Sequence, residues 1–237
     1  MRLSAVALLG VIAVVTAAGA GARARAGGLT PYEAAYRFET HGINAGTVTT
    51  MLRRDDQGQW IAERNAQPRG FARLLTDASH ERSELELSGG GIRPLRYTGS
   101  NGGPDHDVNL SFDWQRQRAT GTIAGRPVDE ALKPGMQDDL SMLVAFAYEL
   151  DNGRMPTTVA TIGDSGVRDY QLTREGTDKL RTPLGDIDTV IYRAQRQGSP
   201  RHTRYWCAPS LGFLPLKAQQ RRNEDVQWTM EISSLKR

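Results

Sequence analysis

Apolar and polar residues alternate in short runs along most of the chain, and turn-forming residues separate these runs. In residues 108–114 every second side chain is apolar, which is the clearest period of two in the sequence. Alternation of this kind is typical of strands with one buried face. Further runs occupy residues 32–40, 47–54, 60–64, 85–87, 92–98, 120–124, 158–162, 169–174, 188–194, 202–206, 214–220 and 226–233. The pattern predicts antiparallel hairpins; residues 41–46 are predicted as a turn-rich break between two of them.

One segment departs from this alternation. Between Asp138 and Leu150, apolar side chains recur at helical spacing on one side, and Met142 and Phe146 occupy another side. A helix that is apolar nearly all round is normally buried. Asp138 and Asp139 are predicted to cap its start, and Asn152-Gly153 its end. The predicted fold is therefore mainly β, a curved antiparallel sheet (open barrel or spiral-like) packed around one buried helix near residues 138–151.

The first 26 residues have the order of a secretory signal peptide. Arg2 supplies the positive start, residues 3–18 are almost entirely apolar, and Ala24-Arg25-Ala26 offers a small-residue cleavage site. We expect residues 1–26 to be removed after export by the general secretory route. Residues 27–237 would then form a single β-rich periplasmic domain with no membrane span.

Charge and cysteine content narrow the range of functions. Three of the 30 basic residues and none of the 27 acidic residues lie in the leader, so the mature chain carries no formal net charge. This balance argues against a nucleic-acid partner. Cys207 is the only cysteine, so an internal disulfide is excluded. We expect Cys207 to be a buried apolar filler.

Sequence motifs for catalysis are missing from the chain. The four histidines have no second histidine at metal-ligand spacing, and Gly89-Gly90-Gly91 lacks the lysine and helix of a phosphate-binding loop. Capping accounts for Asp138 and Asp139 without a catalytic role. We therefore expect a protein that is not an enzyme, with no catalytic residues, metal or cofactor, although residues from distant strands can assemble a site that sequence does not reveal.

Near its end the chain combines an aromatic strand with a Pro-Gly corner. Residues 204–217 read RYWCAPSLGFLPLK, and companion motifs occur at residues 32–46, 137–141, 182–185 and 190–192. In these motifs the chain resembles the domain of unknown function 3108 family, which consists of exported bacterial proteins. The resemblance spans nearly the whole mature chain and implies a periplasmic location without assigning an activity. More loosely, the chain is similar to exported proteins that wrap a curved sheet around a helix, as lipoprotein carriers do.

These observations predict a non-enzymatic protein of the cell envelope that binds an apolar ligand, such as a lipid or a lipidated partner. The rim of the site is assigned to Trp206, Phe213, Leu214 and Pro215, because an aromatic-proline corner is rigid and apolar. Two alternatives stay open: a module that docks an envelope protein without a small ligand, and a hydrolase of envelope polymers. The same corner could also be filled core, and the oligomeric state is left open.

Overall fold

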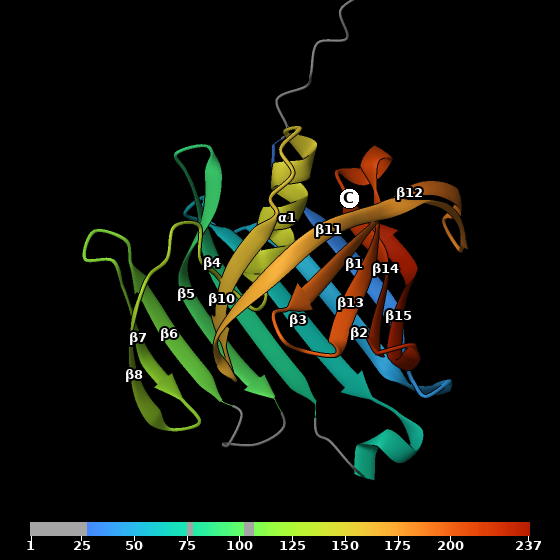
Figure 1. The fold of residues 1–237 in the computed structure, drawn as a ribbon, viewed down its shortest axis with the longest axis horizontal. Coiled ribbons are helices and arrows are strands. Elements are labelled where there is room, and N and C mark those ends of the chain that lie inside the picture. The colour runs from blue at the N-terminus through green and yellow to red at the C-terminus, as the bar shows by residue number, and fades with distance from the viewer. Residues whose placement is uncertain (1–27, 75–77, 102–106) are drawn as a thin grey trace, which may run out of the picture.

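The computed structural model describes residues 28–74, 78–101 and 107–237 of the chain, and in this part nearly all the secondary structure belongs to one curved sheet (Figure 1). The sheet has 15 strands, and one α-helix, α1 (Ser141–Asp151), accompanies it in the described residues. The strands are β1 (Tyr32–Thr40), β2 (Ile43–Arg54), β3 (Trp60–Pro68), β4 (Ser79–Ser88), β5 (Gly91–Asn101), β6 (Val108–Asp113), β7 (Arg118–Ile123), β8 (Arg126–Ala131), β9 (Gln137–Asp138), β10 (Thr158–Gly163), β11 (Gly166–Thr182), β12 (Gly185–Arg196), β13 (Arg201–Ala208), β14 (Leu214–Arg222) and β15 (Asp225–Lys236). The 3-10 helices η1 (Gly70–Leu74) and η3 (Pro209–Leu211) lie in connections between strands.

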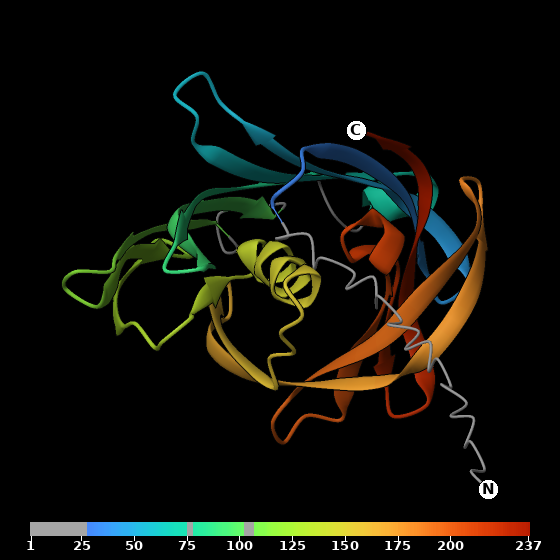
Figure 2. The same cartoon turned by 90° about the horizontal axis from the view of Figure 1, so that it is seen from above.

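The sheet is a meander whose strands pair antiparallel, except for β9 and β10. In the middle of the sheet, the first strand, β1, pairs with the last strand, β15. Its order is β8-β7-β6-β5-β4-β3-β2-β1-β15-β14-β13-β12-β11-β10-β9. β1 pairs with β15 from Glu33 opposite Lys236 to Thr40 opposite Trp228, and β9 pairs with β10 in parallel. The sheet curves strongly but does not close into a barrel, and α1 lies within its curve (Figure 2). The predicted fold class is confirmed.

The helix begins three residues later than the start of the predicted segment. Gln137 and Asp138 stay extended and pair with Thr161 and Ile162 of β10. The Asp138 carboxylate accepts the N–H groups of Leu140 and Ser141, at 2.9 and 2.6 Å, so it satisfies two free donors at the start of the helix. The predicted capping role is therefore right for Asp138. The Asp139 carboxylate instead accepts the hydroxyl of Thr161, at 3.1 Å.

Several strand predictions needed correction. β4 starts six residues before the predicted run 85–87, and β11 ends eight residues after the predicted run 169–174. The turn-rich break predicted at residues 41–46 is only a two-residue turn, because β2 already starts at Ile43. β8 was not predicted at all. Five of its six side chains are exposed, so it lacks the alternation that reveals a half-buried strand, and only pairing with β7 shows it.

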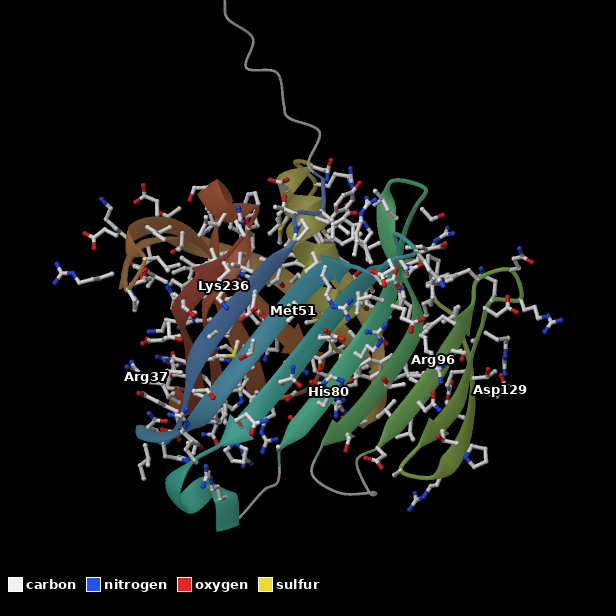
Figure 3. The ribbon with its side chains drawn as sticks, turned by 180° about the vertical axis from the view of Figure 1, so that it is seen from behind. Arg37, Met51, His80, Arg96, Asp129 and Lys236 are labelled. Carbon is white, nitrogen blue, oxygen red and sulfur yellow. The ribbon has the colours of Figure 1, made fainter. Side chains whose placement is uncertain are left out.

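The inner face of the sheet packs against α1, and the outer face is largely polar. One buried cluster joins Val144 of α1 to Leu110, Ile162 and other apolar residues, and another joins Phe146 to Leu172 and Cys207. Cys207 is only 1% exposed, in accordance with its predicted role as a filler. Figure 3 shows Arg37, His80 and Arg96 on the outer face, on strands whose inner side chains include Tyr36, Glu81 and Tyr97.

In residues 28–74, 78–101 and 107–237, no helix has both the length and the hydrophobicity to cross a bilayer. The predicted signal peptide, residues 1–26, lies outside the described part of the chain.

Candidate functional site

Two cavities flank α1. The first cavity, of about 350 Å³, lies between α1 and strands β10 to β13. Met142, Ala145 and Phe146 of the helix form one wall, and side chains that include Leu172, Ala194 and Tyr205 form the other. Leu143 lines this cavity as well as the second one, so the helix separates the two.

The wall of the first cavity is mainly apolar, and its charged residues have partners of their own. Phe146 and Tyr192 pack edge to face, with ring centroids 5.1 Å apart. Lys133 Nζ lies 2.6 Å from an Asp169 carboxylate oxygen. Glu149 is paired with Arg154 outside the cavity. A molecule inside the cavity would therefore contact mainly aliphatic and aromatic side chains.

The second cavity is larger and more polar. It measures about 560 Å³ and lies between α1, the start of the described chain and the corner around η3. Ala147 and Tyr148 of α1 line it together with Asp151, and Arg237 lines it from the end of the chain. The Arg237 guanidinium donates to the Leu211 carbonyl, so the C-terminal residue is fastened to the corner.

A group of buried polar side chains, the α1 latch, holds the start of the helix. It consists of Gln137, Asp138 and Ser141 with Ser83 of β4. The Ser83 hydroxyl donates to Asp138 Oδ2 at 2.6 Å, and Gln137 Nε2 donates to the Ile92 carbonyl of β5 at 2.9 Å. Neither β4 nor β5 is a neighbour of β9 in the strand order. Side-chain hydrogen bonds therefore bridge two parts of the sheet that backbone pairing leaves apart.

Burial dominates the electrostatics of the latch. It raises the pKa of Asp138 to about 6, although the hydrogen bonds from Ser83, Ser141 and Leu140 act in the opposite direction. Burial also raises the pKa of Asp139, and the neighbouring Asp164 carboxylate adds to that effect. The latch thus holds, in the interior of the protein, a carboxyl group whose pKa lies above that of an ordinary aspartate.

A second polar group lies beside the latch on the inner face of β3, β4 and β5. Glu81 is 3% exposed; Arg64 forms an ion pair with one of its oxygens, and the Tyr97 hydroxyl donates to the other at 2.5 Å. Burial alone would raise the pKa of Glu81 and is the largest single influence, but the ion pair and hydrogen bond with Arg64 and the hydrogen bond from Tyr97 together outweigh it and lower that pKa. Both carboxylate oxygens are occupied, an arrangement that favours a structural role over proton transfer.

The four predicted rim residues do not share one cavity wall. Trp206 is 9% exposed; its indole N–H donates to Asp178 at 3.1 Å and Lys217 Nζ lies 5.3 Å from its ring centroid. Phe213 packs against the cluster around Cys207. Leu214 lines the second cavity, and the Pro215 carbonyl accepts the Tyr36 hydroxyl at 3.0 Å.

The first cavity was not located from the sequence. Its walls come from α1, from β10 to β13 and from Gly91 and Ile92 of β5, and only the curvature of the sheet brings these parts together. The second apolar side of the helix, with Met142 and Phe146, was the one sequence signal that pointed to it. In the described residues, no group of three or more histidine, cysteine or acidic side chains could hold a metal ion.

Comparison with known proteins identifies the fold and a family. A family model described as "Protein of unknown function (DUF3108)" matches residues 31–226. The β-barrel-like protein of family DUF1849 from Brucella abortus has 8% identity and a TM-score of 0.62, with coverage of 88% of this chain and 98% of that chain. At this identity the likeness concerns the fold alone.

Other solved structures are more distant. The MucA/MucB complex of Pseudomonas aeruginosa has 12% identity and a TM-score of 0.37, with coverage of 87% of this chain and 51% of that chain. A putative lipoprotein from Parabacteroides distasonis has 10% identity and a TM-score of 0.36, over 88% of this chain and 96% of that chain. No curated protein sequence matches the chain.

Proposed function

The chain belongs to the DUF3108 family, and from its site we propose that it is an exported, non-enzymatic envelope protein that holds an apolar chain of a lipid or lipidated partner in the first cavity. The observation that carries this proposal is the apolar space between α1 and strands β10 to β13. Its volume of about 350 Å³ falls in the lower part of the range of ligand pockets, roughly 300–1,000 Å³. One narrow ligand, such as a single acyl chain, suits such a space.

The composition of the wall supports an apolar ligand over a charged one. Lys133 and Asp169 neutralise each other at 2.6 Å, and Arg193 donates to Gln195 at 2.6 Å. A ligand in the interior meets Met142, Phe146 and Leu172 instead. Burial of apolar surface is worth about 0.8 kcal/mol for each methylene group, so a chain of about ten methylenes gains roughly 8 kcal/mol before the cost of association.

A matched pair of substitutions on α1 tests this proposal. Ala145 lines the first cavity and Ala147 lines the second, and both are half-buried on the same helix. We expect Ala145→Trp to fill the first cavity and to lower the affinity for a fluorescent fatty acid at least tenfold. Ala147→Trp, the control for a bulky residue on this helix, should retain wild-type affinity.

The measurement is fluorescence titration of the mature protein, combined with native mass spectrometry of protein purified gently from the periplasm. Circular dichroism and thermal unfolding establish that both variants fold. A copurified lipid that disappears only in Ala145→Trp would support the proposal. Equal binding by both variants would refute the assignment to the first cavity, and an empty wild-type protein without fatty-acid affinity would favour a module that docks an envelope protein.

A further inference from the structure

The neutral charge of the mature chain conceals a local excess of arginine. Six arginines lie on β12, β13 and β14 close to the ends of two hairpins, and we call them the basic rim: Arg193, Arg196, Arg201, Arg204, Arg221 and Arg222. Three carboxylates lie among them, those of Glu175, Glu224 and Asp225. The turns that join β12 to β13 and β14 to β15 lie at the same end of the sheet (Figure 1).

Strand register brings some of these positive charges directly opposite one another. Arg193 of β12 pairs with Arg204 of β13, and Arg201 of β13 pairs with Arg222 of β14. The Asn223 N–H donates to the Pro200 carbonyl at 2.9 Å and so ties the two turns together. Like charges directly opposite each other across strands are destabilising. Glu175 pairs with both Arg193 and Arg204, at 3.9 and 2.6 Å, so an anionic partner would stabilise the Arg201–Arg222 pair above all.

The centre of the basic rim is short of hydrogen-bond partners. His202 is 7% exposed, and in the described chain neither its Nε2 nor the Nε of Arg193 has a hydrogen-bond partner. Burial lowers the pKa of His202, and Arg193 and Arg204 lower it further. Arg193 donates to Gln195 at 2.6 Å through another guanidinium nitrogen, so the sheet's own side chains satisfy this arginine only in part.

An exposed aliphatic residue lies next to the adjoining turn. Ile43 follows the turn between β1 and β2 and is 69% exposed. The His41 N–H donates to the Gln227 carbonyl of β15 at 3.2 Å, so this turn adjoins the end of β15 next to the rim. Guanidinium groups recognise phosphate oxygens well, and an exposed apolar residue at the same end of the sheet as a basic surface suits an interface with lipid headgroups.

We propose that the basic rim docks the protein on the surface of an anionic phospholipid bilayer. Charge complementarity alone is the argument for docking. The purpose of docking rests on the proposed function, because Arg193 also lines the first cavity. Docking would therefore place that cavity near the source of an apolar chain. Phospholipid phosphates would accept hydrogen bonds from the exposed Arg196, Arg201 and Arg222 and relieve the repulsion between the opposed Arg201 and Arg222.

Vesicle flotation of the mature protein, residues 27–237, tests the proposal. One set of vesicles contains phosphatidylcholine alone, and the other contains about one third phosphatidylglycerol. The rim variant combines Arg196→Gln, Arg201→Gln and Arg222→Gln, all at exposed positions. The control combines Arg116→Gln, Arg126→Gln and Arg181→Gln, which are exposed in or beside other turns and change the net charge equally.

We expect wild type to bind the anionic vesicles and to be released by high salt. A basic residue at an anionic surface contributes roughly fivefold to binding, so the rim variant should lose roughly a hundredfold and the control little. Equal binding by the two variants, absence of vesicle binding by wild type, or binding of a polyphosphate but not of vesicles would each overturn the proposal.

The fatty-acid titration separates this inference from the proposed function. Fatty-acid binding without vesicle binding would overturn the docking and leave the first cavity assigned. Vesicle binding that depends on the basic rim, without fatty-acid binding, would support the docking and refute the assigned cavity.

Discussion

Asparagine in place of Asp138 tests whether the buried carboxylate of the α1 latch makes the protein less stable at neutral pH than in mild acid. Asparagine has nearly the shape of aspartate. Its Oδ1 can accept the N–H groups of Leu140 and Ser141, and its amide can donate to the Ser83 hydroxyl. The substitution therefore keeps the latch and removes one buried charge.

The expected change in unfolding free energy follows from the burial of Asp138. Burial raises its pKa from the ordinary 3.8 to about 6, so the folded protein holds this proton more tightly than the unfolded chain does. The resulting stability is fully present below pH 3.8 and is lost as the pH rises through about 6. A shift of about two pKa units corresponds to roughly 3 kcal/mol, of which about 2 kcal/mol should be lost between about pH 4.5 and 7.5.

Urea unfolding followed by circular dichroism at several pH values measures this effect. Glu81 has a lowered pKa and so contributes stability that is lost as the pH falls, in both proteins alike. When the unfolding free energy of wild type is subtracted from that of Asp138→Asn at each pH, the contribution of Glu81 and of other shared groups cancels. We expect this difference to move by about 2 kcal/mol in favour of the variant from about pH 4.5 to 7.5.

A second variant, Ser83→Ala, separates the loss of a hydrogen bond in the latch from the loss of the buried charge. Ser83→Ala removes the 2.6 Å hydrogen bond to Asp138 but keeps the carboxylate, so it should be less stable than wild type and retain the pH-dependent loss. If the pH profile of Asp138→Asn runs parallel to that of wild type, burial does not penalise the charge, and the reasoning about the latch is wrong.

Two further predictions concern backbone packing and the single thiol. Gly121→Ala should lower the unfolding free energy in urea by at least about 2 kcal/mol more than Gly125→Ala, because a Cβ at Gly121 would lie 1.9 Å from the Asn109 carbonyl oxygen and one at Gly125 meets nothing within 4 Å; equal losses would contradict the observed contact between β6 and β7. Cys207 should resist a thiol reagent such as DTNB in the native protein and react fully in urea, because burial raises the pKa of its thiol. Rapid labelling of the native protein would refute that burial.

Local sequence determined much of the secondary structure. β1 was predicted with its observed bounds, and most other strands were predicted within a few residues, because alternation depends only on neighbours in the chain. The family was also recognisable from contiguous motifs, among them residues 204–217 and 137–141. Those motifs prove to build corners and the α1 latch.

Tertiary structure decided which residues from distant parts of the chain meet in the latch and in the basic rim. Asp138 and Ser83 are 55 residues apart in sequence, and only the curvature of the sheet brings them within 2.6 Å. Opposed arginines such as Arg201 and Arg222 are likewise a consequence of strand register, which the net charge of the chain does not reveal. Sequence periodicity specifies which face of each element is buried. The side chains that meet across the interior depend on how far the sheet curls around its helix.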